Sequence, residues 1–177
     1  MGGVMSKRTN KITEYVNMLR QADIFYDLTD EQLEMVSTLC TEITPPANEI
    51  VFEENSRGDE LYIVANGAID ILVNPSLVQS SSQRQVEPLT IATFRRGQTF
   101  GEISLVDQGL RSAAARCVSR KTRLLVIPRD GLIKLCDQHP DLGYRLMRNI
   151  AADLAFKIRG TDMAIREKLL WRPRVEQ

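Results

Sequence analysis

The sequence predicts a single, mainly β domain with flanking helices, and three observations lead to this fold class. Short apolar runs separated by turn signals fill the middle of the chain, as in antiparallel β domains. Apolar residues recur at helical spacing near both ends. With 177 residues and 43% hydrophobic content, the chain can bury one core of moderate size, so no second folded unit is expected.

The N-terminal region is expected to comprise a disordered end, residues 1–11, and then two helices. Ile12, Val16 and Leu19 recur at helical spacing and predict a short amphipathic helix. The segment Thr29-Asp30-Glu31-Gln32 is a capping box, which indicates that a second helix begins there. That helix should bury four apolar residues: Leu33, Val36, Leu39 and Cys40.

The first six residues match M-G-x-x-x-S, the loose N-myristoylation pattern with Gly2 as acceptor. The pattern is short and frequent by chance, and Met5 could equally be the natural start behind added residues. We therefore expect a disordered end rather than a lipid anchor.

Beyond Pro45-Pro46, which should stop the second helix, the apolar runs predict β-strands. The expected strands are residues 50–52, 61–64, 69–73, 89–94, 113–118 and 122–127. Asn66-Gly67 lies between the second and third and is the strongest hairpin signal in the chain. Residues 74–88 predict a polar loop.

The C-terminal part is expected to be helical. Residues 130–138 predict one helix, His139-Pro140 interrupts it, and a long helix follows from about Asp141. Gly160 could kink the long helix. Its apolar positions form a weak heptad seam: Tyr144, Met147, Ala151, Leu154, Ile158, Thr161 and Ile165.

Charge and cysteine content narrow the partners and the compartment. Lys plus Arg and Asp plus Glu both number 23, so a nucleic-acid partner is not expected. The cysteines, three in number and far apart in sequence, indicate buried thiols in a reducing compartment. No apolar run approaches the roughly 18 residues of a membrane span, so the protein is expected to be cytoplasmic.

The segment FGEISLVDQGLRSAAA, residues 100–115, is the most informative stretch. Gly101 lets the backbone approach a phosphate closely, and a short helical turn after it would aim free N–H groups at an anion. Glu102 can accept a hydrogen bond from a sugar hydroxyl, and Arg111 offers a planar fork for phosphate oxygens. The alternative is purely structural: Gly101 is an ordinary turn glycine, and Arg111 forms a surface ion pair with Glu102 or Asp107.

This segment resembles the phosphate-binding cassette of the cyclic-nucleotide-binding domain family, which reads roughly F-G-E-[LI]-[ACGS]-L followed by R-[AST]-A. The order of elements is similar to that family across residues 12–168, which implies an antiparallel, jelly-roll-like β-roll, with residues 169–177 as a tail. One departure is Ala47-Asn48, where the family usually has Pro-Gly. Asn tolerates the left-handed conformation that Gly would supply.

The resemblance implies a role for each site residue. Glu102 would bind the ribose 2′-hydroxyl, and Arg111 would neutralise the cyclic phosphate. Gly101 would allow the close approach. The other candidate phosphate donors are the N–H groups of Ile103, Ser104, Ser112 and Ala113, and the candidate walls of the purine site are Phe94 and Ala92. Ser112 favours cyclic AMP over cyclic GMP, because several bacterial cyclic-AMP binders resemble this chain in having Arg-Ser there.

The resulting hypothesis is a non-catalytic sensor with no cofactor and no metal, which relays binding through its C-terminal helix to an unknown effector protein. Only residues 171–177 follow that helix, too few for a helix-turn-helix, so a stand-alone sensor, a regulatory piece and a fragment all remain open. The alternative is a dimerising scaffold with a vestigial pocket. At most a weak homodimer is expected. Cupin-type metal chemistry is disfavoured, because His139 is the single histidine.

Overall fold

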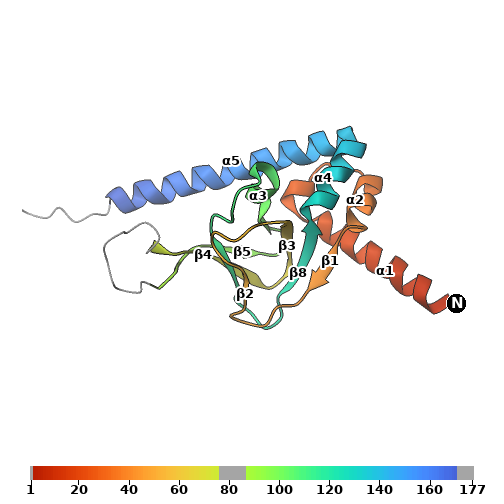
Figure 1. The fold of residues 1–177 in the computed structure, drawn as a ribbon, viewed down its shortest axis with the longest axis horizontal. Coiled ribbons are helices and arrows are strands. Elements are labelled where there is room, and N and C mark those ends of the chain that lie inside the picture. Colours follow the sequence, from red (N-terminus) through yellow and green to blue (C-terminus); the bar gives the residue numbers. More distant parts are fainter. Residues whose placement is uncertain (1, 76–86, 171–177) are drawn as a thin grey trace, which may run out of the picture.

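The computed structural model describes residues 2–75 and 87–170, without the side chains of residues 2–9, 168 and 169. Its strands form two antiparallel sheets, and a long C-terminal helix passes across the top of the molecule (Figure 1). Most of the predicted polar loop, residues 74–88, and most of the predicted tail, residues 169–177, lie outside the described residues.

The helices are α1 (Gly2–Leu19), the 3₁₀ helix η1 (Asp23–Phe25), α2 (Asp30–Ser37), α3 (Glu102–Asp107), α4 (Arg129–Gln138) and α5 (Pro140–Leu170). The strands are β1 (Thr41–Ile43), β2 (Ile50–Phe52), β3 (Glu60–Asn66), β4 (Ala68–Val73), β5 (Leu89–Arg95), β6 (Thr99–Phe100), β7 (Ala114–Cys117) and β8 (Arg123–Pro128).

The strand order is β1-β8-β3-β6 in one four-stranded sheet and β2-β7-β4-β5 in the other. This architecture, with helices on both ends of the β region, confirms the predicted fold class. All six predicted strands are present. The sequence missed β1 and β6, because Thr41–Ile43 contains a single apolar residue and Thr99–Phe100 is only two residues long.

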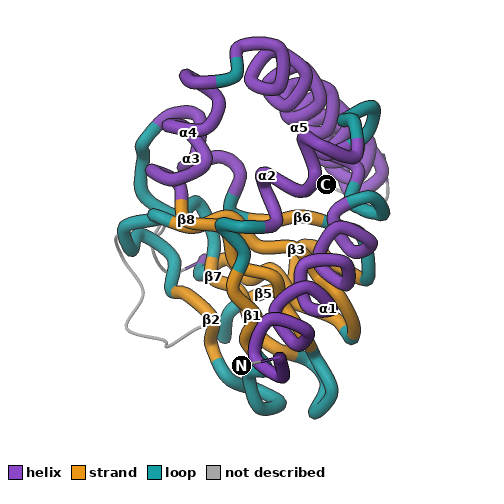
Figure 2. The backbone as a smooth tube through the Cα atoms, turned by 90° about the vertical axis from the view of Figure 1, so that its right-hand side faces the viewer, coloured by secondary structure: helices purple, strands orange, loops and turns teal. Residues whose placement is uncertain are grey.

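Within the β1-β8-β3-β6 sheet, β3 and β8 are buried on both faces, which explains why they are continuous apolar runs. On β3, Leu61 and Ile63 belong to the core shared with the helices, whereas Tyr62 and Val64 belong to the core between the sheets. Figure 2 shows α3, α4 and α5 gathered beyond one side of the strands. The helices and the second sheet thus cover opposite faces of the first sheet.

The hairpin predicted at Asn66-Gly67 is wrong. The chain does turn there, with Gly67 at φ 84°, but β3 pairs with β6 and β8 while β4 pairs with β5 and β7. Asn66 Nδ2 donates to the Lys121 carbonyl oxygen at 2.9 Å, and a Cβ on Gly67 would lie 2.5 Å from Thr122 Oγ1. The turn therefore packs against residues before β8 and carries the chain from one sheet to the other.

The N-terminal helix is longer than the sequence predicts. α1 begins at Gly2, so residues 2–11, expected to be disordered, continue the helix that Ile12 to Leu19 predict. Tyr15, Val16 and Leu19 are buried in the helical core and anchor the end of α1. Extending an existing helix needs no new nucleus, and residues 2–11 contain no proline that would stop it.

Several local predictions are confirmed. Thr29 and Gln32 form the reciprocal capping box at the start of α2. Asn48 has φ 68°, the left-handed conformation expected where the family usually has Gly. The three cysteines are free and buried, and burial raises the pKa of the Cys40 thiol to about 12. α5 includes Gly160 and continues to Leu170, so the long C-terminal helix that the sequence predicts is present.

Candidate functional site

Gly101 joins β6 to α3 and is the N-cap of that helix, with φ 83°. Only a residue without a side chain adopts this conformation at low cost. A Cβ at this position would also lie 2.5 Å from Arg111 Nη1 and 2.9 Å from the Glu60 carbonyl oxygen. The glycine of the motif is therefore needed by the protein's own packing, in addition to any close approach of a ligand.

The backbone of Arg111 is fixed by the loop that precedes β3. Its N–H donates to the Ser56 carbonyl oxygen, and its carbonyl oxygen accepts from the N–H of Asn55, each at 2.8 Å. Gly58 follows in the same loop, and a Cβ there would lie 2.5 Å from Arg111 Nε. The loop before β3 and the segment around Arg111, about fifty residues apart in sequence, thus lie side by side and form one corner of the site.

The Arg111 guanidinium is enclosed, and only 3% of the residue is exposed. Nη1 donates to Ser104 Oγ at 2.9 Å and to the Gly101 carbonyl oxygen at 3.1 Å. Nη2 donates to the Glu60 carbonyl oxygen at 2.8 Å. The group also lies over the Phe52 ring, with Cζ 4.3 Å from the ring centroid. Arg111 is therefore a buried, firmly held guanidinium and not one half of a surface ion pair.

Burial lowers the pKa of Arg111 from its ordinary value, while electrostatic interactions with Tyr62 and Glu60 oppose that shift. An arginine in this position remains cationic at neutral pH. Its Nε is buried and has no hydrogen-bond partner among the described residues. A buried charged donor without a partner is costly, so the site favours an added acceptor with negative charge.

Glu102, the first residue of α3, is 4% exposed. Its Oε1 accepts a hydrogen bond from Lys157 Nζ of α5 at 2.9 Å. The same Nζ lies 4.9 Å from the centroid of the Phe94 ring on β5. Because one ammonium contacts both groups, the Glu102 carboxylate of the cassette and the Phe94 ring of β5 lie close to each other.

The structure brings Gly101, Ser104 and Arg111 into direct contact, and it links Glu102 with Phe94 through Lys157. The other predicted site residues differ in exposure: Ala113 is buried, Ala92 is half-buried, and Ile103 and Ser112 are exposed. Ala92 and Phe94 both pack against the core between the sheets. Their functional roles stay predictions.

Sequence reasoning did not assign five residues that build this site: Phe52, Gly58, Glu60, Tyr62 and Lys157. The first four lie within or beside residues 53–62, which resemble another recurrent segment of the family, and that resemblance was the available signal. Lys157 had none, because it lies 55 residues from Glu102 and on another element.

Over residues 2–75 and 87–170, no cluster of three or more His, Cys, Asp or Glu side chains is arranged to hold a metal ion. In the same ranges, no helix combines the length and the apolarity that crossing a bilayer requires.

Residues 43–139 match the family described as the cyclic nucleotide-binding domain, and this match covers more than half of the chain. The chain belongs to this family. Proteins of the family bind the cyclic nucleotide as a ligand and not as a cofactor. The matched range contains the cassette, the loop with Gly58 and the Phe94 strand, whereas Lys157 lies outside it.

Relatives of this chain include a cyclic AMP receptor protein and a protein kinase regulatory subunit. The cyclic AMP receptor protein of Thermus thermophilus is 26% identical over 147 residues, which are 83% of this chain and 62% of that protein. The cAMP-dependent protein kinase regulatory subunit of Aspergillus fumigatus is 30% identical over 109 residues, which are 60% of this chain and 26% of that protein. The chain thus spans less than two thirds of the length of these relatives.

Solved structures show the same fold. A cyclic nucleotide-binding domain from Methylobacillus flagellatus has a TM-score of 0.75 at 20% identity, covering 94% of this chain and 88% of that one. The Thermus thermophilus catabolite activator protein has a TM-score of 0.65 at 27% identity, covering 82% of this chain and 62% of that one.

Proposed function

We propose that this protein is a non-catalytic sensor that binds a 3′,5′-cyclic nucleotide, prefers cyclic AMP, and relays binding through α5 to a partner protein. The observation that carries the proposal is the pair of buried, oppositely charged groups in the cassette, Glu102 and Arg111. Neither group is a surface charge, and Arg111 Nε still lacks a partner among the described residues.

The chemistry of this corner matches the three parts of a cyclic nucleotide. Arg111 offers one positive charge to one anionic phosphodiester, and charge-assisted hydrogen bonds of this kind are stronger than neutral ones. Glu102 is an acceptor for the ribose 2′-hydroxyl, which stays free when the phosphate bridges the 3′ and 5′ oxygens. Phe94 offers a ring face to the purine, and it shares a neighbour, Lys157, with Glu102.

The preference for cyclic AMP rests on Ser112, which directly follows Arg111. Threonine at this position is typical of family members that favour cyclic GMP, because its hydroxyl can also reach the guanine. Serine is intermediate, and Arg-Ser resembles several bacterial cyclic-AMP binders. The relatives include both a cyclic AMP receptor protein and cGMP-dependent protein kinases, so the choice must be measured.

The proposed output is a protein effector rather than nucleic acid, because acidic and basic residues balance at 23 each. The proposed location is the cytoplasm, which the three free cysteines favour. A second candidate function is a dimerising scaffold with a vestigial pocket. The exposed apolar side chains of α5, among them Phe156 at 74% and Ile158 at 61%, favour it.

Isothermal titration with cyclic AMP, cyclic GMP and 5′-AMP tests the proposal. We expect both cyclic nucleotides to bind, cyclic AMP more tightly, and 5′-AMP least, because its open phosphate carries an extra charge. No binding of either cyclic nucleotide at millimolar concentration would leave the scaffold as the better function. A preference for cyclic GMP would overturn the selectivity alone.

Hydrogen exchange with and without the bound nucleotide tests the relay. Nucleotide should change the exchange of backbone amides in residues 150–170 of α5. Unchanged exchange there, despite demonstrated binding, would mean that the signal leaves the domain by another route.

A further inference from the structure

The two parts of α5 are held by different contacts. Leu142, Leu146 and Ile150 are fully buried in the helical core, so the first part of α5 is anchored by apolar packing. Beyond residue 150, most side chains are half-buried or exposed. The second part therefore depends on few contacts for its position.

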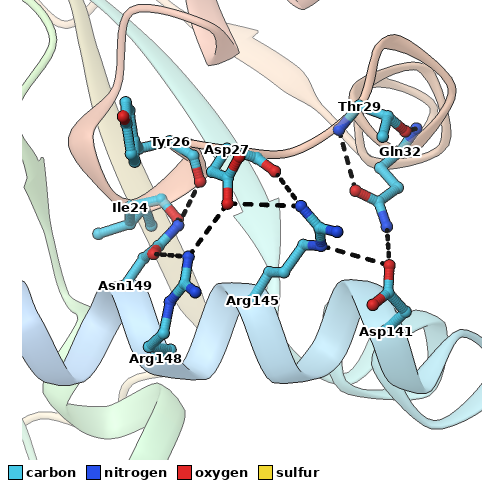
Figure 3. A network of polar contacts seen from close by, with 9 residues as sticks. All are labelled: Ile24, Tyr26, Asp27, Thr29, Gln32, Asp141, Arg145, Arg148 and Asn149. Atoms are coloured by element: carbon cyan, nitrogen blue, oxygen red, sulfur yellow. Dashed lines mark hydrogen bonds and ion pairs between the residues drawn. The ribbon is translucent and has the colours of Figure 1, made fainter.

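A polar network adds to the anchor of the first part (Figure 3). Asn149 Nδ2 donates to the carbonyl oxygens of Ile24 and Tyr26, and Arg145 and Arg148 both pair with the Asp27 carboxylate. These bonds join α5 to η1 and to the loop before α2. None of them reaches the cassette, so they cannot by themselves report what the cassette binds.

Lys157 reaches the strands and the cassette from the second part of α5. Its Nζ donates to Glu102 Oε1 at 2.9 Å and to the Thr99 carbonyl oxygen at 3.0 Å. It also lies 4.9 Å from the centroid of the Phe94 ring. Asp153, one helical turn earlier, pairs with the same ammonium at 2.7 Å and steadies it from within α5.

These contacts put the ammonium where two parts of the ligand would bind. Glu102 is the proposed acceptor for the ribose, and Phe94 is the proposed wall for the purine. A carboxylate can accept several hydrogen bonds, but one ring face cannot hold both an ammonium and a purine at contact distance. Binding of a nucleotide at both groups thus requires Lys157 to move.

We infer that Lys157 is an autoinhibitory latch: in the nucleotide-free protein it occupies the sugar and base positions and ties the second part of α5 to the cassette. The inference rests on the proposed function for the identity of the competing ligand. The nucleotide and the helix then compete for Glu102 and Phe94. Binding releases Lys157, and this exchange links pocket occupancy to the position of residues 151–170.

The test compares Lys157→Met with the parent protein by titration with cyclic AMP. Methionine keeps the length and the helix propensity of the side chain and removes the ammonium. Because a closed latch lowers apparent affinity by the fraction of molecules that are open, we expect Kd to fall about threefold to thirtyfold. Lys157→Arg, which keeps the charge, should stay near the parent value, and Lys134→Met on the exposed side of α4 should leave Kd unchanged.

An equal or higher Kd in Lys157→Met would overturn the latch; a higher one would mean that Lys157 contacts the nucleotide directly. A second measurement needs no ligand. In nucleotide-free Lys157→Met, amides of residues 155–167 should exchange faster than in the parent, and equal rates would show that Lys157 does not hold the helix. If no variant binds a cyclic nucleotide, the proposed function fails, and the competition between the nucleotide and Lys157 fails with it. The exchange rates of the ligand-free proteins still show whether Lys157 holds the second part of α5 on the cassette.

Discussion

Arg111 makes structural contacts within the protein itself, independent of any ligand. Its guanidinium satisfies the carbonyl oxygens of Gly101 and Glu60 and lies on the Phe52 ring. The residue that the cassette assigns to a phosphate therefore also closes the corner between β3, β6 and α3. Any substitution of Arg111 changes both the charge offered to a ligand and the local packing, and the two effects must be separated.

Substitutions of Arg111 and Glu102 should weaken nucleotide binding by different amounts. Arg111→Ala should cost about 2–4 kcal/mol of binding free energy, because it leaves the buried phosphate without its cation. Glu102→Ala should cost less and should narrow the gap between cyclic AMP and its 2′-deoxy analogue. Calorimetry measures both, and circular dichroism checks the fold.

Arg111→Lys serves as the companion variant, since it keeps the charge while losing the planar fork, and it should bind with intermediate affinity. An Arg111→Ala protein that is folded and binds as tightly as the parent would contradict the proposed phosphate role.

Gly58 offers a second test of the same corner from the opposite side. An alanine Cβ there would meet Ser104 Oγ at 2.4 Å and Arg111 Nε at 2.5 Å, so the guanidinium must shift. We expect Gly58→Ala to destabilise the fold by about 1–3 kcal/mol through overpacking and to weaken cyclic-nucleotide binding. Thermal denaturation and titration measure the two effects.

Gly160→Ala is the matched control, because a Cβ there meets no atom within 4 Å. In an exposed helix it should stabilise α5 by about 0.5–1 kcal/mol and leave binding at the cassette intact. Equal behaviour of the two alanine variants would mean that the tight contacts around Gly58 do not position Arg111.

At the scale of elements, α5 is the connection between the helical core and the cassette. Its first part is fixed by buried leucines and by the Asn149 network, whereas Lys157 joins its second part to the cassette by a hydrogen bond to Glu102. A helix with one fixed part and one weakly held part can move as a lever. The second part can pivot in a defined way only while the first part stays packed in the helical core.

Asn149→Ala should weaken this fixed part. Asn149 is 9% exposed, and loss of its side chain would leave the carbonyl oxygens of Ile24 and Tyr26 without that donor, at a cost of about 1–3 kcal/mol. Urea denaturation measures the change in the free energy of unfolding.

Arg148→Ala removes an exposed partner of Asp27 from the same network and should cost less than about 1 kcal/mol. If this control proved as costly as Asn149→Ala, the stability of the junction would come from its charges rather than from the buried amide.

At the scale of the whole molecule, the apolar surface of α5 decides how the domain associates. The predicted heptad seam is divided in the structure: Met147 and Leu154 pack against the domain's own core, while Tyr144, Ile158 and Ile165 are exposed. A coiled coil needs the whole seam on one free face. The exposed remainder is enough for a weak contact between copies and too little for a tight one.

We therefore expect a weak homodimer, with a Kd on the order of 0.1–1 mM, because few anchoring side chains remain for an interface. Sedimentation velocity over a concentration series measures it. Ile158→Ser with Ile165→Ser should make the protein monomeric without changing nucleotide affinity. A parent that sediments as a dimer at low micromolar concentration, or a substituted protein that still dimerises, would contradict this assignment of the interface.

The sequence by itself determined the features that depend on neighbouring residues. The capping box of α2, the apolar runs of β3 and β8, the left-handed Asn48 and the turn at Gly101 all follow from local spacing or from one residue's backbone preference. The cassette also belongs here, because Glu102 and Arg111 lie nine positions apart within one motif.

Only the tertiary structure decided the contacts that join distant segments. Asn66-Gly67 reads as a hairpin, yet pairing with β6 and β8 directs β3 into a different sheet from β4, since strand partners are chosen by the burial of whole faces. Likewise, no periodicity connects Lys157 with Glu102 across 55 residues. Their hydrogen bond forms because packing of the first part of α5 in the helical core places the rest of the helix over the cassette. Packing between distant segments of this kind leaves no local sequence pattern.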